Sequence, residues 1–522
     1  MRKWQMTFRR KNELVFVIVF AVLIVFYSYS FLSIQFYPFV DSPNHIAEAT
    51  IYKYYENDDN NFDQHYTLNH AWYPNTFHLY FCSLPIFETV QKGDHILNYL
   101  IIISLPFIVL GIISTLGGNI WASLLSFLFI FNYNITYGFT GNELAVNFVF
   151  IILWLYLIDL KKSKLYLKSL IGILLALIFF MHAQITLFAL LMMGVFSLVK
   201  YRKKTLNLFL CILYALAPLA LIVNWWFKKQ IDSQQSGSTG DSNLEYLSKY
   251  YGSEFFLTFY KRFNFLVNDN LQLQEGLPGK FIALGFFITV LFPVFAIVVK
   301  GISFENLKTT VAKLNIQIRF LLIFLIVTLC CYFFLPEGIP GQFPVNTRLT
   351  TLIPITFILL ISLIGYENRI YWYSLVLIVL AHGALWTRHF QEFDAEAREV
   401  VAMLPENQGQ LFTGLIIHEN YKGRPSYRHF HNYFIAEKKG ISTSKIIEFR
   451  FGMIRKHEDS KLPEHQEKWR DFDIEHFALL IDQVDHILFK GNIEQVLSAF
   501  HDRIKVLNSY QDWHILSSMP ND

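Results

Sequence analysis

The stretch YPFVDSPNHIAEATIYKYYE, residues 37–56, begins where the first long apolar run of the chain ends. Asp41 and His45 are four residues apart, so a helix over this segment would place both side chains on one face. Pro43 suits the first turn of such a helix, with Asp41 or Ser42 as its cap. A carboxylate and an imidazole held together beside a membrane indicate acid–base chemistry on a molecule that the membrane delivers. The alternative is that Asp41 only caps the helix.

The composition is typical of a membrane protein. Of the 522 residues, 53% are hydrophobic, and the mean hydropathy is +0.34, well above the usual apolar share of soluble domains. Phe and Tyr are abundant, which suits lipid-facing helices with aromatic belts at the interfaces. The net charge is only +3, so no nucleic-acid partner is indicated. Three of the four cysteines lie in apolar runs, so no disulfide framework is predicted.

Apolar runs that are long enough to cross a bilayer, or nearly so, recur through residue 387. We predict about eleven spans, at 13–36, 95–116, 119–137, 143–160, 167–182, 184–200, 205–227, 280–300, 318–335, 348–365 and 371–387. The first follows a basic N-terminus and lacks a clear cleavage site, so it is expected to be a retained anchor. The fifth and sixth form one continuous run that is too long for a single helix. A hairpin is therefore predicted, with its tip at His182.

The distribution of basic residues predicts the orientation of the chain. With eleven spans, the Lys- and Arg-rich loops all fall on the cytoplasmic side, together with the N-terminus. The loops at 37–94 and 228–279 then lie outside the cytoplasm, as does everything after residue 387. The second loop joins a Gly/Ser-rich stretch to an aromatic one and is predicted to be a mobile flap. We expect an integral membrane protein with a cytoplasmic N-terminus and an extracytoplasmic C-terminal domain.

The composition changes after residue 387, where charged residues become more frequent and apolar residues come in short blocks. Three segments have the pattern of strands and two have the pattern of amphipathic helices. The strands are expected at 409–418, 484–491 and 512–518, and the helices at 395–405 and 492–508. This alternation predicts a small α/β domain. The expected domains are thus a polytopic α-helical transmembrane module over 1–387 and a soluble α/β domain over 388–522.

Polar residues gather in five groups on the side predicted to be extracytoplasmic. The candidates are Asp41, Asn44 and His45 after the first span, Glu143 between the third and fourth, His182 at the hairpin tip, Lys261 and Arg262 in the 228–279 loop, and Glu337 and Arg348 before the tenth. Polar groups at the edge of a span are costly unless they line a cavity, so each is a functional candidate. For His182 alone, an interfacial hydrogen bond is the simpler interpretation.

Arg348 stands where the tenth span enters the membrane, after a Gly/Pro-rich loop. A guanidinium grips phosphate through two parallel hydrogen bonds and keeps its charge. The alternative is an arginine that only reaches toward lipid headgroups. The phosphate role is favoured because Arg348 lies on the same predicted side as Asp41, and because arginine on the outer side runs against the usual charge bias.

The order of these features resembles the GT-C glycosyltransferases, in which a first span and an early acidic residue precede many spans and an outer α/β domain. Residues 41–45, DSPNH, resemble the Asp-x-Pro-x-His of bacterial members. Residues 426–440, SYRHFHNYFIAEKKG, are similar to an aromatic-His-Phe-x-x-Tyr block in the soluble part of such proteins. The resemblance implies an enzyme of the cell envelope that takes a sugar from a polyprenyl-phosphate donor.

The resemblance also implies roles for individual residues. Asp41 would be the general base that deprotonates an acceptor hydroxyl, and His45 would assist it. Arg348 would hold the donor phosphate, and the other substrate-binding candidates are Asn44, Glu143, His182, Lys261, Arg262 and Glu337. A single displacement would invert the sugar carbon, and the acceptor would be a lipid, a glycan or a protein. His45 could instead be a metal ligand, but a lone histidine does not support a metal site, and no Asp-x-Asp or Glu-x-Asp pair stands at Asp41, so no metal or other cofactor is predicted.

Three other functions are consistent with parts of the sequence. A transporter or lipid flippase should carry charges near the middle of broken spans, and the predicted spans are nearly free of such charges. An envelope polysaccharide ligase or acyltransferase would need similar polar groups outside the cytoplasm. The sequence therefore does not distinguish such an enzyme from a glycosyltransferase. A non-enzymatic scaffold for the C-terminal domain would leave Asp41 and Arg348 without a purpose.

Overall fold

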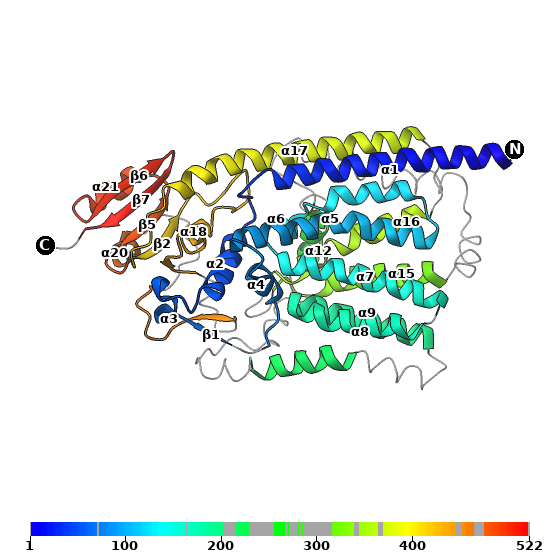
Figure 1. The fold of residues 1–522 in the computed structure, drawn as a ribbon, viewed down its shortest axis with the longest axis horizontal. Coiled ribbons are helices and arrows are strands. Elements are labelled where there is room, and N and C mark those ends of the chain that lie inside the picture. The colour runs from blue at the N-terminus through cyan, green and yellow to red at the C-terminus, as the bar shows by residue number, and fades with distance from the viewer. Residues whose placement is uncertain are drawn as a thin grey trace.

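The computed structural model describes most of the chain. The described residues are 2–519, apart from 70–71, 163, 202–214, 229–254, 267–269, 271–279, 281–283, 286–315, 339–343, 364–368, 445–451 and 464–473. The fold is mostly helical, with a sheet near the C-terminus (Figure 1). Most of the predicted flap at 228–279 and most of the eighth predicted span lie outside the described residues, although α12 (Phe255–Asn264) is described.

Six described helices are long and apolar enough to cross a membrane. They are α1 (Arg2–Leu32), α5 (Val90–Leu116), α7 (Thr140–Lys162), α9 (Ala183–Tyr201), α15 (Ile316–Phe334) and α17 (Arg369–Ala402). They coincide with the first, second, fourth, sixth, ninth and eleventh predicted spans. The predicted total of about eleven is not confirmed.

Four other predicted spans are shorter apolar segments. They are η2 (Ile120–Phe129) with α6 (Tyr133–Thr136), α8 (Leu165–Met181), a helix over Ala215–Lys228, and η4 (Asn346–Leu349) with α16 (Leu352–Ser362). Every η2 residue from Ala122 to Phe129 is buried. A helix that is apolar all round and buried in protein has the same hydropathy as a lipid-facing one. The sequence pattern therefore did not distinguish the two. The predicted break at His182 is present between α8 and α9.

The segment between α1 and α5 lies at the same end of the helix array as the C-terminal sheet, away from the N-terminus (Figure 1). It contains α2 (Ser42–Lys53), η1 (Asp58–Asn60), α3 (Phe62–His65), β1 (Tyr66–Leu68) and α4 (Phe77–Cys82). Strand β1 pairs in antiparallel with β4 (Ile454–Lys456). The Tyr66 hydroxyl also donates to the carbonyl of Ser442 at 2.8 Å. The early loop and the C-terminal part thus pack as one unit at this end of the helix array, which we call the outer unit for its place at the edge of the array.

The C-terminal sheet has five strands in the order β3-β2-β5-β7-β6. These are β2 (Leu411–Ile416), β3 (Ile441–Ser442), β5 (His486–Lys490), β6 (Ile504–Tyr510) and β7 (Trp513–Ser518), with the short helices η5 (Phe430–Asn432), α18 (Tyr433–Lys438), α20 (Ile474–Ile481) and α21 (Ile493–Phe500). Strand β2 is parallel to β3 and β5, whereas β7 is antiparallel to β5 and β6. The three predicted strands are β2, β5 and β7.

Both helices predicted after residue 387 differ from the structure. Residues 395–402 are the end of α17, which continues from the eleventh span without a break because no Gly or Pro occurs between residues 384 and 404. The Nε1 of Trp513 donates to Glu396 at 2.9 Å, which joins this helix to the sheet. The helix predicted at 492–508 ends at Phe500, and β6 follows. Ile504 and Val506, two residues apart, pack into the sheet core with the period of a strand.

Candidate active site

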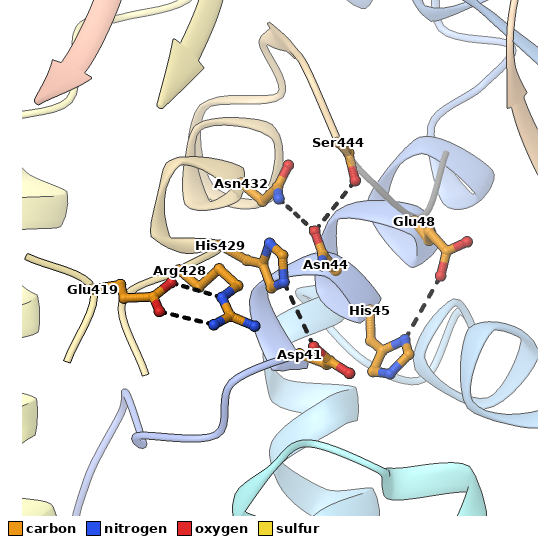
Figure 2. Close-up of polar contacts among 9 residues, drawn as sticks. All are labelled: Asp41, Asn44, His45, Glu48, Glu419, Arg428, His429, Asn432 and Ser444. Carbon is orange, nitrogen blue, oxygen red and sulfur yellow. Dashed lines mark hydrogen bonds and ion pairs between the residues drawn. The ribbon is translucent and has the colours of Figure 1, made fainter. Parts of the chain in front are cut away.

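Helix α2 begins directly after Asp41, with Pro43 in its first turn, as the sequence predicted. The Asp41 side chain makes no cap hydrogen bond to this helix, so the alternative of a capping residue lacks the contact that it requires. The Oδ1 atom of Asp41 instead lies 3.6 Å from Nε2 of His429, and the Asp41 side chain is 22% exposed (Figure 2). The carboxylate is thus held beside an imidazole and remains accessible.

The backbone at Asp41 is held by the turn between α6 and α7. The N–H groups of Val40 and Asp41 donate to the carbonyls of Thr136 and Tyr137 at 3.2 and 3.0 Å. Gly138 in this turn has a φ of +87°, and a Cβ there would lie 2.7 Å from the Asp41 nitrogen. Only glycine permits both this left-handed backbone and this close approach.

We expect Gly138→Ala to displace Asp41 and to lower the free energy of unfolding by about 1–3 kcal/mol. The new methyl group would meet backbone atoms that cannot rotate away. Gly117 provides a matched control, because its φ is +73° and no atom lies within 4 Å of the position that a Cβ would take there. Gly117→Ala should therefore lower the free energy of unfolding by less, because it adds backbone strain but no steric clash. Thermal unfolding in detergent measures both variants, and equal losses would contradict the close approach at Asp41.

The C-terminal part supplies three basic residues around Asp41. His429 approaches the carboxylate directly. Arg428 forms a two-pronged pair with Glu419, with N–O distances of 2.7 and 2.8 Å (Figure 2). Arg424 donates to the Thr136 hydroxyl at 2.8 Å. These residues were not among the sequence candidates, although His429 and Arg428 lie in the 426–440 block that carries the family resemblance.

Arg348 lies in η4. Its guanidinium carbon is 3.1 Å from the centroid of the Phe139 ring, and its Nε donates to the Pro344 carbonyl at 3.1 Å. The turn at residues 137–139 links this cation with Asp41, because the Phe139 ring lies 4.6 Å from the Tyr137 ring and the Tyr137 carbonyl accepts from the Asp41 N–H at 3.0 Å. Burial raises the pKa of the Tyr137 hydroxyl and Asp41 raises it further, whereas Arg428 and Arg348 lower it. Asp41 and Arg348, far apart in the sequence, therefore share one charged neighbourhood around Tyr137.

Glu143 stands at the start of α7 and is almost completely buried. Its carboxylate accepts hydrogen bonds from four side chains. The donors are Asn132 at 2.8 Å, Asn134 at 3.0 Å, Asn142 at 3.1 Å and Thr351 at 3.1 Å. The Asn142 amide also donates to the carbonyl of Arg348 at 3.3 Å. Glu143 thus organises the backbone that carries Arg348, which favours a positioning role over direct substrate binding.

Asn44 and His182 are also buried within the protein. The Oδ1 of Asn44 accepts from the Asn432 amide at 2.5 Å and from the Ser444 hydroxyl at 3.2 Å, which ties α2 to the C-terminal part (Figure 2). His182 joins α8 to α9, and its Nδ1 accepts from the Ile185 N–H at 3.4 Å. Asn44 thus holds α2 against the C-terminal part, and His182 stabilises the junction of α8 and α9.

The three remaining candidates lie around α12 and the end of α15. Arg262 is buried and donates to the carbonyls of Tyr332 and Phe333 at 3.1 and 2.7 Å. Arginine commonly satisfies the last carbonyls of a helix in this way. Lys261 and Glu337 are exposed. Arg262 thus has a structural contact. No side-chain hydrogen bond or ion pair within the described residues indicates a function for Lys261 or Glu337.

The His45 side chain points toward Glu48, one turn further along α2 (Figure 2). Burial lowers the pKa of His45, but the Glu48 carboxylate outweighs this effect and the net pKa is raised. Burial raises the pKa of Glu48, but His45 and His78 outweigh it and the net pKa is lowered. His45 was expected to assist Asp41. Among the described ion pairs, His429 is the imidazole that approaches Asp41, at 3.6 Å, and the assisting role of His45 stays a prediction.

No protein-family model and no curated protein matches this chain. The function is therefore inferred from the residues around Asp41 themselves.

Proposed function

We propose that the protein is an integral-membrane glycosyltransferase of the bacterial inner membrane. It would move a sugar from a polyprenyl-phosphate-linked donor to an acceptor hydroxyl on the extracytoplasmic side, with inversion of the sugar carbon. One observation carries the proposal: the accessible Asp41 carboxylate, which makes no cap hydrogen bond, lies beside the turn whose Phe139 ring contacts the Arg348 guanidinium, and its neighbour His429 directly follows Arg428. A base beside cations suits a reaction in which a hydroxyl loses a proton while a phosphate leaves.

In the proposed reaction, Asp41 takes the proton of the acceptor hydroxyl as its oxygen attacks the sugar carbon. The bond between this carbon and the phosphate oxygen breaks, and the polyprenyl phosphate leaves with the electron pair. Arg348 stabilises the negative charge of the leaving phosphate. His429, 3.6 Å from the Asp41 carboxylate, orients the base. The two charged groups thus act on opposite ends of one displacement.

The charges described within the long helices do not favour a transporter. Asp159 pairs with Lys200 at 3.1 Å, and these residues lie near the ends of α7 and α9. Asp94 lies in the second turn of α5 and accepts from the Ser42 hydroxyl at 3.1 Å. Charges on a substrate pathway are expected near the middle of the membrane. Asp159, Lys200 and Asp94 lie near the ends of their helices, where polar contacts stabilise the fold, and not in the middle of the helices where a substrate pathway would need them.

The proposal is tested with the full-length protein in lipid nanodiscs. The protein is incubated with polyprenyl-phosphate sugars labelled in the sugar and with an envelope extract that supplies acceptors. We expect the label to leave the lipid fraction and unlabelled polyprenyl phosphate to appear. Consumption of polyprenyl-diphosphate glycans alone would favour the polysaccharide ligase, and label transfer from acyl donors alone would favour the acyltransferase. Either result, or no consumption of any sugar donor, would overturn the proposal.

We expect Arg348→Ala to raise the KM for the donor by about 10–100-fold, because a charge-assisted contact to phosphate contributes roughly 1.5–3 kcal/mol. Arg348→Lys should recover part of this loss, since lysine keeps the charge but not the two-pronged geometry. Initial rates at varied donor concentration measure both variants. Arg388→Ala is the control, because Arg388 is an exposed residue that pairs with Glu392. An unchanged donor dependence in Arg348→Ala would remove Arg348 from the phosphate role.

A further inference from the structure

Two helices of the outer unit bring three potential metal ligands together. His45 and Glu48 are one turn apart on α2, and His78 lies on α4. Nδ1 of His45 and Nε2 of His78 lie 3.7 and 3.8 Å from the same Glu48 oxygen. One ligand atom from each of the three residues lies within 4.8 Å of the other two. The three donor atoms thus converge on one point.

Hydrogen bonding does not account for this arrangement. Distances of 3.7 and 3.8 Å are too long for hydrogen bonds. Within the described part of the chain, His45 Nδ1 and His78 Nε2 are buried atoms without a hydrogen-bond partner. Glu48 and His78 are each only 5% exposed. The ion pair of His45 with Glu48 offsets part of the cost of burial but leaves both imidazole nitrogens without a hydrogen-bond partner, whereas a bound cation would satisfy all three groups.

We propose that His45, Glu48 and His78 bind a divalent transition-metal ion of the zinc class, with a further coordination position open to water. Two imidazoles and one carboxylate form a known three-ligand set for zinc. Ligands about 2.1 Å from a tetrahedral centre lie roughly 3.4 Å apart. The separations of 3.7 and 3.8 Å from the Glu48 oxygen are close to this value, and the two imidazole nitrogens, which lie within 4.8 Å of each other, would approach by side-chain rotation to close around an ion.

The metal would join α2 to α4 one helical turn from Asp41. Helix α4 supplies a single ligand, His78, so the ion would fasten the outer loop to the helix that carries the candidate base. The site does not depend on the proposed glycosyl transfer. If the protein binds the ion but transfers no sugar, the metal site stands and the proposed function fails. If it transfers sugar but binds no ion, the proposed function stands and the metal site fails.

The experiment uses the full-length protein, purified through a tag without histidine and stripped with a chelator. We expect Zn²⁺ to bind with a stoichiometry of one ion per chain and to raise the thermal unfolding temperature. Co²⁺ should give the visible absorption of a low-coordinate site. Glu48→Gln and His78→Gln should each weaken Zn²⁺ binding by at least about 100-fold, more than the loss typical of an outer-shell partner. Circular dichroism and monodisperse elution establish that each variant is folded.

His65→Gln is the matched control, because His65 belongs to the same outer loop and contacts Ser460 at 3.1 Å, outside the three-residue cluster. It should bind Zn²⁺ as the wild type does. The wild-type titration tests the site without any variant: if neither Zn²⁺ nor Co²⁺ binds at micromolar concentration, the proposal is wrong. Undiminished binding by folded Glu48→Gln and His78→Gln proteins would place the ion elsewhere and overturn the assignment.

Discussion

Asp41→Asn is expected to lower the rate of sugar transfer by about 10²–10⁴-fold, the usual contribution of a general base. The amide has nearly the same shape as the carboxylate but accepts no proton at neutral pH. The side chain of Asp41 makes no cap hydrogen bond to α2, so the substitution should leave the helix and the folded protein intact. Turnover at saturating donor, together with thermal unfolding of the same preparation, separates lost chemistry from lost structure.

Asp63→Asn is the control for this experiment. Asp63 is an exposed carboxylate on α3 in the same outer loop, and its loss should leave turnover unchanged. His429→Gln should reduce turnover to a smaller extent than Asp41→Asn, because His429 orients the carboxylate at 3.6 Å and does not take the proton itself. Normal turnover by the Asp41→Asn protein would exclude Asp41 as the base, whatever the behaviour of His429.

The sequence identified the start of α2 and the Arg348 cation, but not the partners of Asp41 in the C-terminal part. The start of α2 after Asp41 follows from the end of an apolar run and a proline in the first turn of the helix. His429 and Arg428 come nearly four hundred positions later, and no local periodicity relates them to Asp41. Only the resemblance of the 426–440 block pointed toward that segment. The close approach of Gly138 to Asp41 likewise depends on tertiary packing.

The same distinction applies to the fold and to the proposed metal ligands. Hydropathy identified the long helices, whereas the span predicted at 119–137 corresponds to the buried η2 and the short α6 and is not confirmed as a membrane crossing. His45 and Glu48 are three residues apart, so their shared helix face is visible in the sequence. His78 becomes their neighbour only because α4 packs against α2. A lone histidine in the sequence therefore gave no indication of a three-ligand site.

Glu143→Leu is expected to have the largest effect on stability. It would remove the acceptor of hydrogen bonds from Asn132, Asn134, Asn142 and Thr351. Each donor left unpaired in the interior costs about 1–3 kcal/mol, so we expect a loss on the order of 3–6 kcal/mol after partial rearrangement. Thermal or denaturant unfolding in detergent measures this loss. Glu143→Gln should lose less, because its carbonyl oxygen still accepts part of the network.

The position of Glu143 also makes this experiment a test of how the site is held together. The Asn142 amide bonds both to Glu143 and to the carbonyl of Arg348, so loosening the network should displace the guanidinium as well. Glu143→Gln, if folded, should therefore raise the KM for the donor in the same direction as Arg348→Ala, but by less. If Glu143→Leu instead unfolds like the wild type and loses only donor binding, Glu143 contacts the substrate directly. In that case Glu143 would be a second substrate-binding group beside Arg348. It would not be a structural residue that positions the Arg348 backbone.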